Sequence, residues 1–194
     1  MLQPEQPVLI LASSSPRRQE LLREAGIAFE VHPAHINEDQ RPYEPPLDYA
    51  CRLAREKAEA VAQRFPQRSV LGADTIVIVD QEVLGKPRDP ADAVRMLRRL
   101  SARSHNVTTA VCVISPSGKT ETQSCTTQVF FRQIAENEIQ QYVAGGEPMD
   151  KAGAYAIQGG ASRWTNRIEG EYSNVVGLPL SLVTEMLRKN GFLK

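Results

Sequence analysis

The sequence predicts an α/β protein built on a mixed sheet. Strand-like and helix-like segments alternate in the first half of the chain, and strand-like segments cluster in the second half. Hydrophobic residues make up 41% of the 194 residues and charged residues 24%, as in ordinary globular proteins. The chain is long enough to bury a core and has no internal repeat or long linker. We therefore expect residues 1–194 to form one domain.

The first elements are a buried strand, a helix and a loop. Residues 8–12 are a short apolar run followed by serines, which is typical of a buried strand. In the helix that follows, Ser15 suits the N-cap, Pro16 suits the first helical position and Gly26 is placed to end it. Residues 32–46 are polar and contain several prolines, so we expect a loop there.

The middle of the chain predicts two helices around a strand and a turn. Residues 47–64 have helical periodicity. Residues 69–79 form an apolar, β-branched strand that should be buried on both faces, and residues 80–84 form a turn into a short return strand. Asp89 is a suitable cap for a helix over residues 90–100, because Pro90 follows it directly.

The second half of the chain predicts a hairpin, two helices and two short strands. The hairpin pairs residues 105–115 with residues 120–132 across a Pro-Ser-Gly turn. Helices are expected at residues 135–144 and 180–190. Two short strands are expected to flank the loop at residues 158–162.

Charge and apolar patterns argue against several classes of protein. The 23 basic residues balance 23 acidic ones, so we expect no nucleic-acid partner. Export signals and membrane-length apolar runs are absent from the sequence, so we expect a cytoplasmic protein without a membrane partner. Three cysteines without C-x-x-C spacing predict free thiols, and His32 and His35 lack matching ligands and are expected to be solvated.

Two arginines stand where a helix should begin. A cation in the first turn of a helix is disfavoured by about 0.3–1 kcal/mol, and Arg17 and Arg18 both take that position. A bound anion would reverse the effect, because the first amides of the helix, the serine hydroxyls and both guanidinium groups would converge on it. The alternative is that both arginines bend into water.

Three further charged residues conflict with their surroundings. Lys57 falls inside the apolar stripe of its helix, whereas Arg52 falls on the polar face. Lys57 either extends its ammonium to the surface or points into a cleft that holds an anion. Asp74 interrupts a buried strand, where it either binds nearby amides or acts as a metal ligand or general base. Lys86 follows the turn, and the return strand could bring it near Asp74.

This set of residues suits a polyphosphate with a divalent cation. Basic groups would bind the phosphate oxygens, and a carboxylate would hold the metal or activate water. The sequence lacks the P-loop pattern, the G-x-G-x-x-G fingerprint and the G-x-S-x-G elbow, so other common phosphate and hydrolase sites are not indicated.

Six motifs in order carry a resemblance to a known family. They are LASSSPRRQELL, LAREKA, LGADTIVIV, LGKPRD, KAGAYAIQG and VVGLPL, spread over nearly the whole chain. The sequence resembles the Maf family of nucleoside triphosphate pyrophosphatases. The resemblance implies an elongated α/β fold with a curved mixed sheet and two lobes around a cleft, similar to the inosine triphosphate pyrophosphatases. It also implies hydrolysis between the α and β phosphates with a divalent metal, Mg²⁺ or Mn²⁺, and frequent homodimers.

The resemblance also implies roles for individual residues. Asp74 would be the proton acceptor, and Glu38 in the loop would complete a metal or water site with it. Four residues would surround the triphosphate substrate: Ser13, Arg18, Lys57 and Lys86.

Three positions bear on the base that is recognised. Arg17, Thr75 and Gln158 match relatives that act on dTTP and UTP, whereas relatives acting on 7-methylguanosine triphosphate have an aromatic residue, Gln and Glu there. A glutamine amide can donate to and accept from a uracil edge. The chain departs from the family pattern at Ala156, where many relatives have glycine, and at Asn37, which replaces an acidic residue. A 7-methylguanosine enzyme, a broad pyrophosphatase and a nucleotide-binding regulator of cell division are the alternatives.

Overall fold

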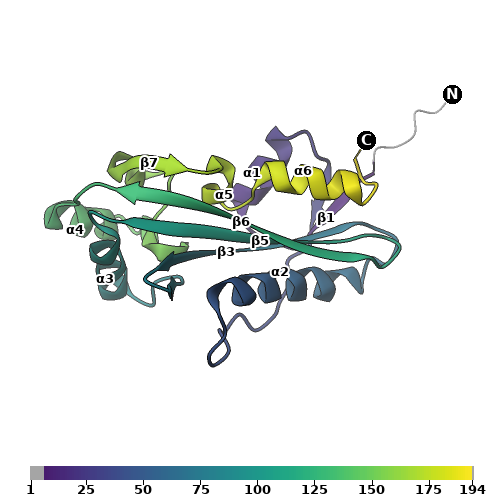
Figure 1. The fold of residues 1–194 in the computed structure, drawn as a ribbon, viewed down its shortest axis with the longest axis horizontal. Coiled ribbons are helices and arrows are strands. Elements are labelled where there is room, and N and C mark those ends of the chain that lie inside the picture. The colour runs from purple at the N-terminus through teal and green to yellow at the C-terminus, as the bar shows by residue number, and fades with distance from the viewer. Residues whose placement is uncertain (1–6, 194) are drawn as a thin grey trace.

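The computed structural model describes residues 7–193, which fold around an open seven-stranded mixed sheet (Figure 1). The strand order is β2-β1-β3-β5-β6-β7, and β4 pairs with part of β3. The pairs β2-β1 and β1-β3 are parallel, and all the others are antiparallel. The strands are β1 (Leu9–Leu11), β2 (Phe29–Val31), β3 (Val70–Val79), β4 (Glu82–Leu84), β5 (Ser104–Ile114), β6 (Thr120–Phe131) and β7 (Thr165–Glu169).

Six α-helices and three 3₁₀ turns complete the described chain. The helices are α1 (Pro16–Glu24), α2 (Pro46–Ala62), α3 (Pro90–Leu100), α4 (Glu136–Ala144), α5 (Tyr172–Val176) and α6 (Leu180–Lys189). The 3₁₀ turns are η1 (Glu147–Asp150), η2 (Ala152–Ala154) and η3 (Gly160–Trp164). The predicted cap of α3 is confirmed, because the Asp89 carboxylate accepts a 2.7 Å hydrogen bond from the Asp92 amide.

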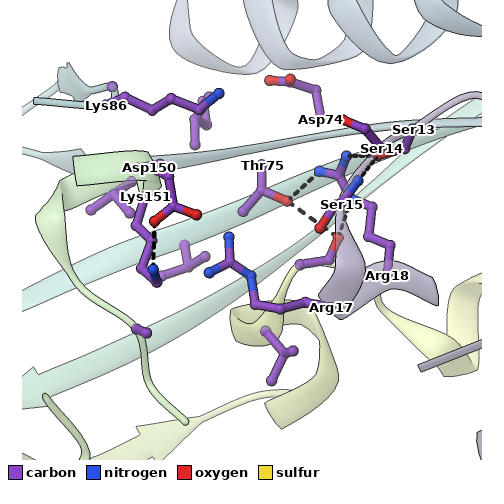
Figure 2. A pocket seen from close by; sticks show the side chains of 18 of the residues that line it. Ser13, Ser14, Ser15, Arg17, Arg18, Asp74, Thr75, Lys86, Asp150 and Lys151 are labelled. Atoms are coloured by element: carbon purple, nitrogen blue, oxygen red, sulfur yellow. Dashed lines mark hydrogen bonds and ion pairs between the residues drawn. The ribbon is translucent and has the colours of Figure 1, made fainter. Parts of the chain in front are cut away.

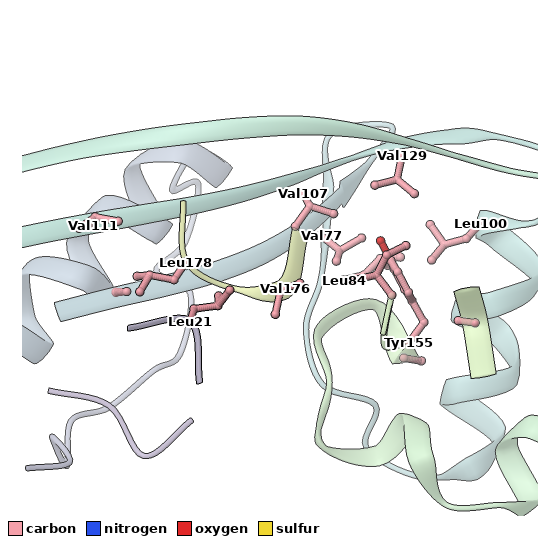
Figure 3. Close-up of a cluster of buried hydrophobic side chains, with 14 of the residues drawn as sticks. Leu21, Val77, Leu84, Leu100, Val107, Val111, Val129, Tyr155, Val176 and Leu178 are labelled. Atoms are coloured by element: carbon pink, nitrogen blue, oxygen red, sulfur yellow. The ribbon is translucent and has the colours of Figure 1, made fainter. Parts of the chain in front are cut away.

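Helix α2 covers one face of the sheet, and the other helices pack on the opposite side. The alanines of α2 meet apolar residues of β1, β3 and β5, including Ile10, Val70 and Ala110. The larger core cluster joins the other sheet face to α1, α3, α4 and α6. Figure 3 shows the part of this cluster that includes α1 and α3. Gly72 brings α2 close to the sheet, since a Cβ atom there would overlap the Ala54 carbonyl oxygen.

The long strands give the molecule its elongated shape and leave a gap at one strand edge. β3, β5 and β6 run along the molecule, with α1, α2 and α6 toward one end and α3 and α4 at the other (Figure 1). On one side of β3, β1 pairs only as far as Leu71, and β4 begins to pair at Val77. Residues 72–76 therefore have no neighbouring strand on that side, and side chains from both sheet faces can meet there.

The segment before residue 158 differs from the sequence prediction. The expected strand there is wrong, because the chain forms turn η2, in which Gly153 and Ala154 have φ of +69° and +60°. Left-handed residues cannot extend a strand. The strand expected after the loop is confirmed as β7. The short elements β2 and α5 were not predicted.

Two further findings concern the thiols and the apolar segments of residues 7–193. The three cysteines are free thiols. In the same part of the chain, no helix is long and apolar enough to cross a membrane.

Candidate active site

A cavity of about 600 Å³ opens at the uncovered stretch of β3 (Figure 2). This volume is in the range of small-molecule binding sites. All nine residues predicted to act in the site line it: Ser13, Arg17, Arg18, Glu38, Lys57, Asp74, Thr75, Lys86 and Gln158. The structure thus brings together residues that lie up to 145 positions apart in the chain.

A buried ion pair forms the floor of the cavity. The Lys57 ammonium lies 2.8 Å from Asp74 Oδ1 and 3.0 Å from Glu38 Oε1. Lys57 and Asp74 are buried, whereas Glu38 reaches in from an exposed loop. Burial raises the pKa of Asp74 above its usual value, and the charges of Lys57 and Arg18 oppose the rise. A carboxylate with a raised pKa in a cleft is suited to accept a proton.

The loop that carries Glu38 is held against α2. Tyr49 donates a 2.7 Å hydrogen bond to the Glu38 carbonyl oxygen. Arg52 donates to both carboxylate oxygens of Glu44, at 2.6 and 2.8 Å, and to the Asp39 carbonyl at 3.0 Å. Arg52 lies on the polar face of its helix, as predicted, and contacts Glu56 there at 3.1 Å, but its burial was not expected, because this loop covers it. The pairing also lowers the pKa of Glu44 to about 2.

The two arginines of α1 differ in their surroundings. Arg18 is buried, and its guanidinium donates to Gly177 O at 2.9 Å, Ser13 Oγ at 2.9 Å and Thr75 Oγ1 at 3.0 Å. Arg18 therefore joins α1 to β3 and to the chain after α5. Arg17 is only partly buried, and it points into the cavity toward the segment of Asp150 and Lys151 (Figure 2).

The N-terminus of α1 also faces the cavity. Ser15 occupies the N-cap position, as predicted, but its side chain forms no cap hydrogen bond. Ser13, Ser14 and Ser15 all line the cavity. The first turn of α1 therefore keeps amide donors for an anion, and its dipole favours negative charge there.

The opposite wall comes from β4 and from the turns before β7. Lys86 is exposed and makes no ion pair with any carboxylate of the described residues. Gln158 is exposed, and its amide has no hydrogen-bond partner in residues 7–193. Lys151 also lines the cavity but was not singled out, although it begins the KAGAYAIQG motif. Its ammonium donates to the Glu147 carbonyl at 2.7 Å.

The arrangement combines an anion site with a proton acceptor. Arg17, Lys86 and the start of α1 offer positive charge to phosphate groups, and the buried Asp74 lines the same cavity. In the described chain, no group of three or more His, Cys, Asp or Glu side chains could hold a metal ion. A cation at Asp74 and Glu38 would therefore need further oxygen ligands from a bound molecule.

Known proteins are similar to this chain in sequence over nearly its whole length. A dTTP/UTP pyrophosphatase of Koribacter versatilis (strain Ellin345) is 55% identical over 95% of each chain. The protein of that name from Geobacter metallireducens is 51% identical over 98% of this chain and 100% of its own. The solved structure of the Staphylococcus aureus Ham1 protein matches 93% of this chain and 98% of its own, with a TM-score of 0.53 at 15% identity. This likeness confirms the predicted fold class.

The match to a family model covers nearly the whole chain. A family model described as Maf-like protein matches residues 8–190, which include the cavity and nearly the whole sheet. The six sequence motifs all lie within the match. The chain therefore belongs to the Maf family.

Proposed function

We propose that this protein is a pyrophosphatase that converts dTTP and UTP to their monophosphates and pyrophosphate. The observation that carries the proposal is the Asp74–Lys57–Glu38 cluster on the floor of a cavity whose walls hold Arg17 and Lys86. The activity in the names of relatives at 51–55% identity supports it.

The cluster can supply the proton transfer that hydrolysis needs. Water attacks the α-phosphorus, a new P–O bond forms, and the bond from the α-phosphorus to the bridging oxygen breaks to release pyrophosphate. Asp74 takes the proton of the attacking water, which its raised pKa favours. Lys57 fixes the orientation of the Asp74 carboxylate through its 2.8 Å hydrogen bond.

Basic groups on the walls would bind the charged end of the substrate. Lys86, Arg17 and the amides at the start of α1 can offset the charge that gathers on the leaving pyrophosphate. Ser13 contributes a hydroxyl beside them, and its oxygen already accepts from Arg18. Arg18 acts in the proposal by holding Ser13 and Thr75 in place and by adding positive charge behind them.

Asp74 and Glu38 fit a divalent cation such as Mg²⁺ or Mn²⁺. Both carboxylates face one point, because each lies within 3.0 Å of the same ammonium, and hard oxygen ligands suit these ions. When bound, the cation would neutralise charge on the phosphate oxygens and bring its own water ligands. The protein supplies two ligands, and the triphosphate would supply others.

The proposed preference for pyrimidine bases depends on Gln158, which also lines the cavity. The free amide of Gln158 can read the donor and acceptor pattern of a uracil or thymine edge. Thr75 would act indirectly, since its hydroxyl already contacts Arg18, Thr109 at 2.9 Å and the Gly177 carbonyl at 3.3 Å. We also retain the prediction that residues 1–194 form one domain that assembles as a cytoplasmic homodimer.

A substrate panel tests the proposal. Pyrophosphate release would be measured with dTTP, UTP, CTP, GTP and 7-methyl-GTP, with Mg²⁺ or Mn²⁺ and with EDTA. We expect dTTP and UTP to be the best substrates, EDTA to stop turnover and Asp74→Asn to abolish it while leaving the fold intact. A preference for 7-methyl-GTP would refute the pyrimidine assignment. An Asp74→Asn protein that keeps full turnover would refute the proposed chemistry.

A further inference from the structure

The segment that carries Gln158 is anchored by side chains outside the cavity. Tyr142, on α4, accepts a 3.1 Å hydrogen bond from the Ala156 amide and donates a 2.8 Å hydrogen bond to Glu147 Oε1. Glu147 in turn accepts from the Gly160 amide, at 3.2 and 3.3 Å. The two anchored amides lie two residues before and two residues after Gln158. The segment is therefore fixed on both sides of the residue that faces the cavity.

The carboxylate of Glu147 also lies unusually close to the backbone of this segment. A Cβ atom at Gly159 would overlap Glu147 Oε1 and lie 3.0 Å from Oε2. The contact therefore requires a residue without a Cβ atom at position 159, and it leaves little room for the segment to move toward η1. The carbonyl oxygen of the same residue accepts from Lys151, which lines the cavity.

Tyr142 is a rigid support for this contact. Its side chain is buried, and its ring packs edge-on against Trp164 with centroids 4.8 Å apart. Burial raises the pKa of Tyr142, so the hydroxyl keeps the proton that it donates to Glu147. Neither Tyr142 nor Glu147 lines the cavity, so both support the segment from outside it.

We propose that Tyr142 and Glu147 are positioning residues that set base specificity by holding Gln158 in place. The inference rests on the proposed function, in which Gln158 recognises the base. A side-chain amide discriminates between bases only when its donor and acceptor are held at fixed points. Loosening the segment should therefore reduce the preference for pyrimidines and leave phosphate binding and chemistry largely unchanged.

The test compares two variants with a conservative one and a control. Glu147→Ala and Tyr142→Phe each remove hydrogen bonds to the segment, whereas Glu147→Gln keeps the Oε1 acceptor. Glu136→Ala is the control, because Glu136 is an exposed carboxylate in the first turn of α4 that pairs with Arg98 and Gln140 instead. The measured quantity is the ratio of kcat/KM for UTP to kcat/KM for GTP.

We expect this ratio to fall about tenfold in Glu147→Ala and Tyr142→Phe, as for the loss of one well-formed hydrogen bond. The value of kcat/KM for GTP should change less than twofold. Glu147→Gln and the control should keep the native ratio. In a Gln158→Ala background, Glu147→Ala should have no further effect on the ratio, since the group that it positions is gone.

The outcomes separate this inference from the proposed function. An equal loss on UTP and GTP, parallel to a loss of thermal stability, would make the pair merely structural and overturn the inference. A native ratio kept by both Glu147→Ala and Tyr142→Phe, while Gln158→Ala loses it, would also overturn the inference and leave the proposed function standing. A native enzyme without preference for UTP would overturn both.

Discussion

Replacing Lys57 by methionine tests whether the buried ion pair is as tightly coupled as its geometry indicates. The side chain lies in the apolar stripe of α2, near Leu53, Ala54 and Val61, so methionine fits the helix and its packing. The change removes the only cation that hydrogen-bonds Asp74 in the described chain and leaves a buried carboxylate. We therefore expect a loss of stability that originates at Asp74.

The loss of stability expected for Lys57→Met has an upper limit. When its partner is removed, the Asp74 carboxylate can take up a proton. This costs about 1.4 kcal/mol for each pH unit above the ordinary pKa of the group, and pH 7 lies roughly three units above that pKa. The cost of breaking a buried pair is about 3–5 kcal/mol in other proteins. Arg18 still adds favourable charge near Asp74. We expect Lys57→Met to lower the free energy of unfolding by about 3 kcal/mol at pH 7.5.

The loss should depend on pH in a defined direction. Removing Lys57 raises the pKa of folded Asp74 further above its unfolded value, because burial is then opposed by less positive charge. A raised pKa favours the folded state below the unfolded pKa, and this advantage is lost as pH rises through the folded pKa. The deficit of the variant should therefore be about 2 kcal/mol smaller at pH 5.5 than at pH 7.5.

Urea unfolding at the two pH values measures both effects. Lys86→Met is the matched control, since this exposed lysine makes no ion pair in residues 7–193 and should leave stability unchanged. The double variant Lys57→Met/Asp74→Asn should recover most of the lost stability, because no buried charge remains. Equal deficits at both pH values, without recovery in the double variant, would refute the coupling.

Three further variants test how the cavity is built. Gly72→Ala should cost about 2–3 kcal/mol in urea unfolding and reduce turnover, because a Cβ atom there would lie 2.8 Å from the Ala58 amide and push α2 from the sheet; unchanged stability would contradict the close packing. Arg52→Met should speed proteolysis within residues 37–45 and lower kcat, whereas the exposed Arg55→Met should do neither. Arg17→Ala should change the ranking of nucleotide substrates more than thermal stability; equal losses on every base would instead make it a phosphate contact.

The regular elements could be predicted because their signals are local. The cap at Asp89 and the hairpin of β5 and β6 depend on residues that are neighbours in sequence, and both are present in the structure. β2 and α5 have only three and five residues, too few for a periodic pattern to appear. The failed strand before Gln158 contains Ala154 in a left-handed conformation, which alanine does not signal.

The candidate site was predictable where a charged residue broke a pattern. Lys57 in an apolar stripe and Asp74 in a buried strand each conflict with their element, and both lie in the cavity. Arg52 gave no such signal, because the loop that covers it is a tertiary feature. Glu147 gave none either, since its contact is with the backbone of a segment that begins nine residues later.

The difference between Arg17 and Arg18 follows from helix geometry rather than from composition. Consecutive residues of an α-helix point about 100° apart, so two adjacent arginines have different surroundings. Leu21 and Leu22 mark the buried side of α1, and Arg18 lies three and four residues before them, on the same face. In this position Arg18 donates hydrogen bonds to Ser13, Thr75 and Gly177. Arg17 points into the cavity instead (Figure 2). The apolar residues one turn further along therefore decide which cation supports the site and which one is available to a substrate.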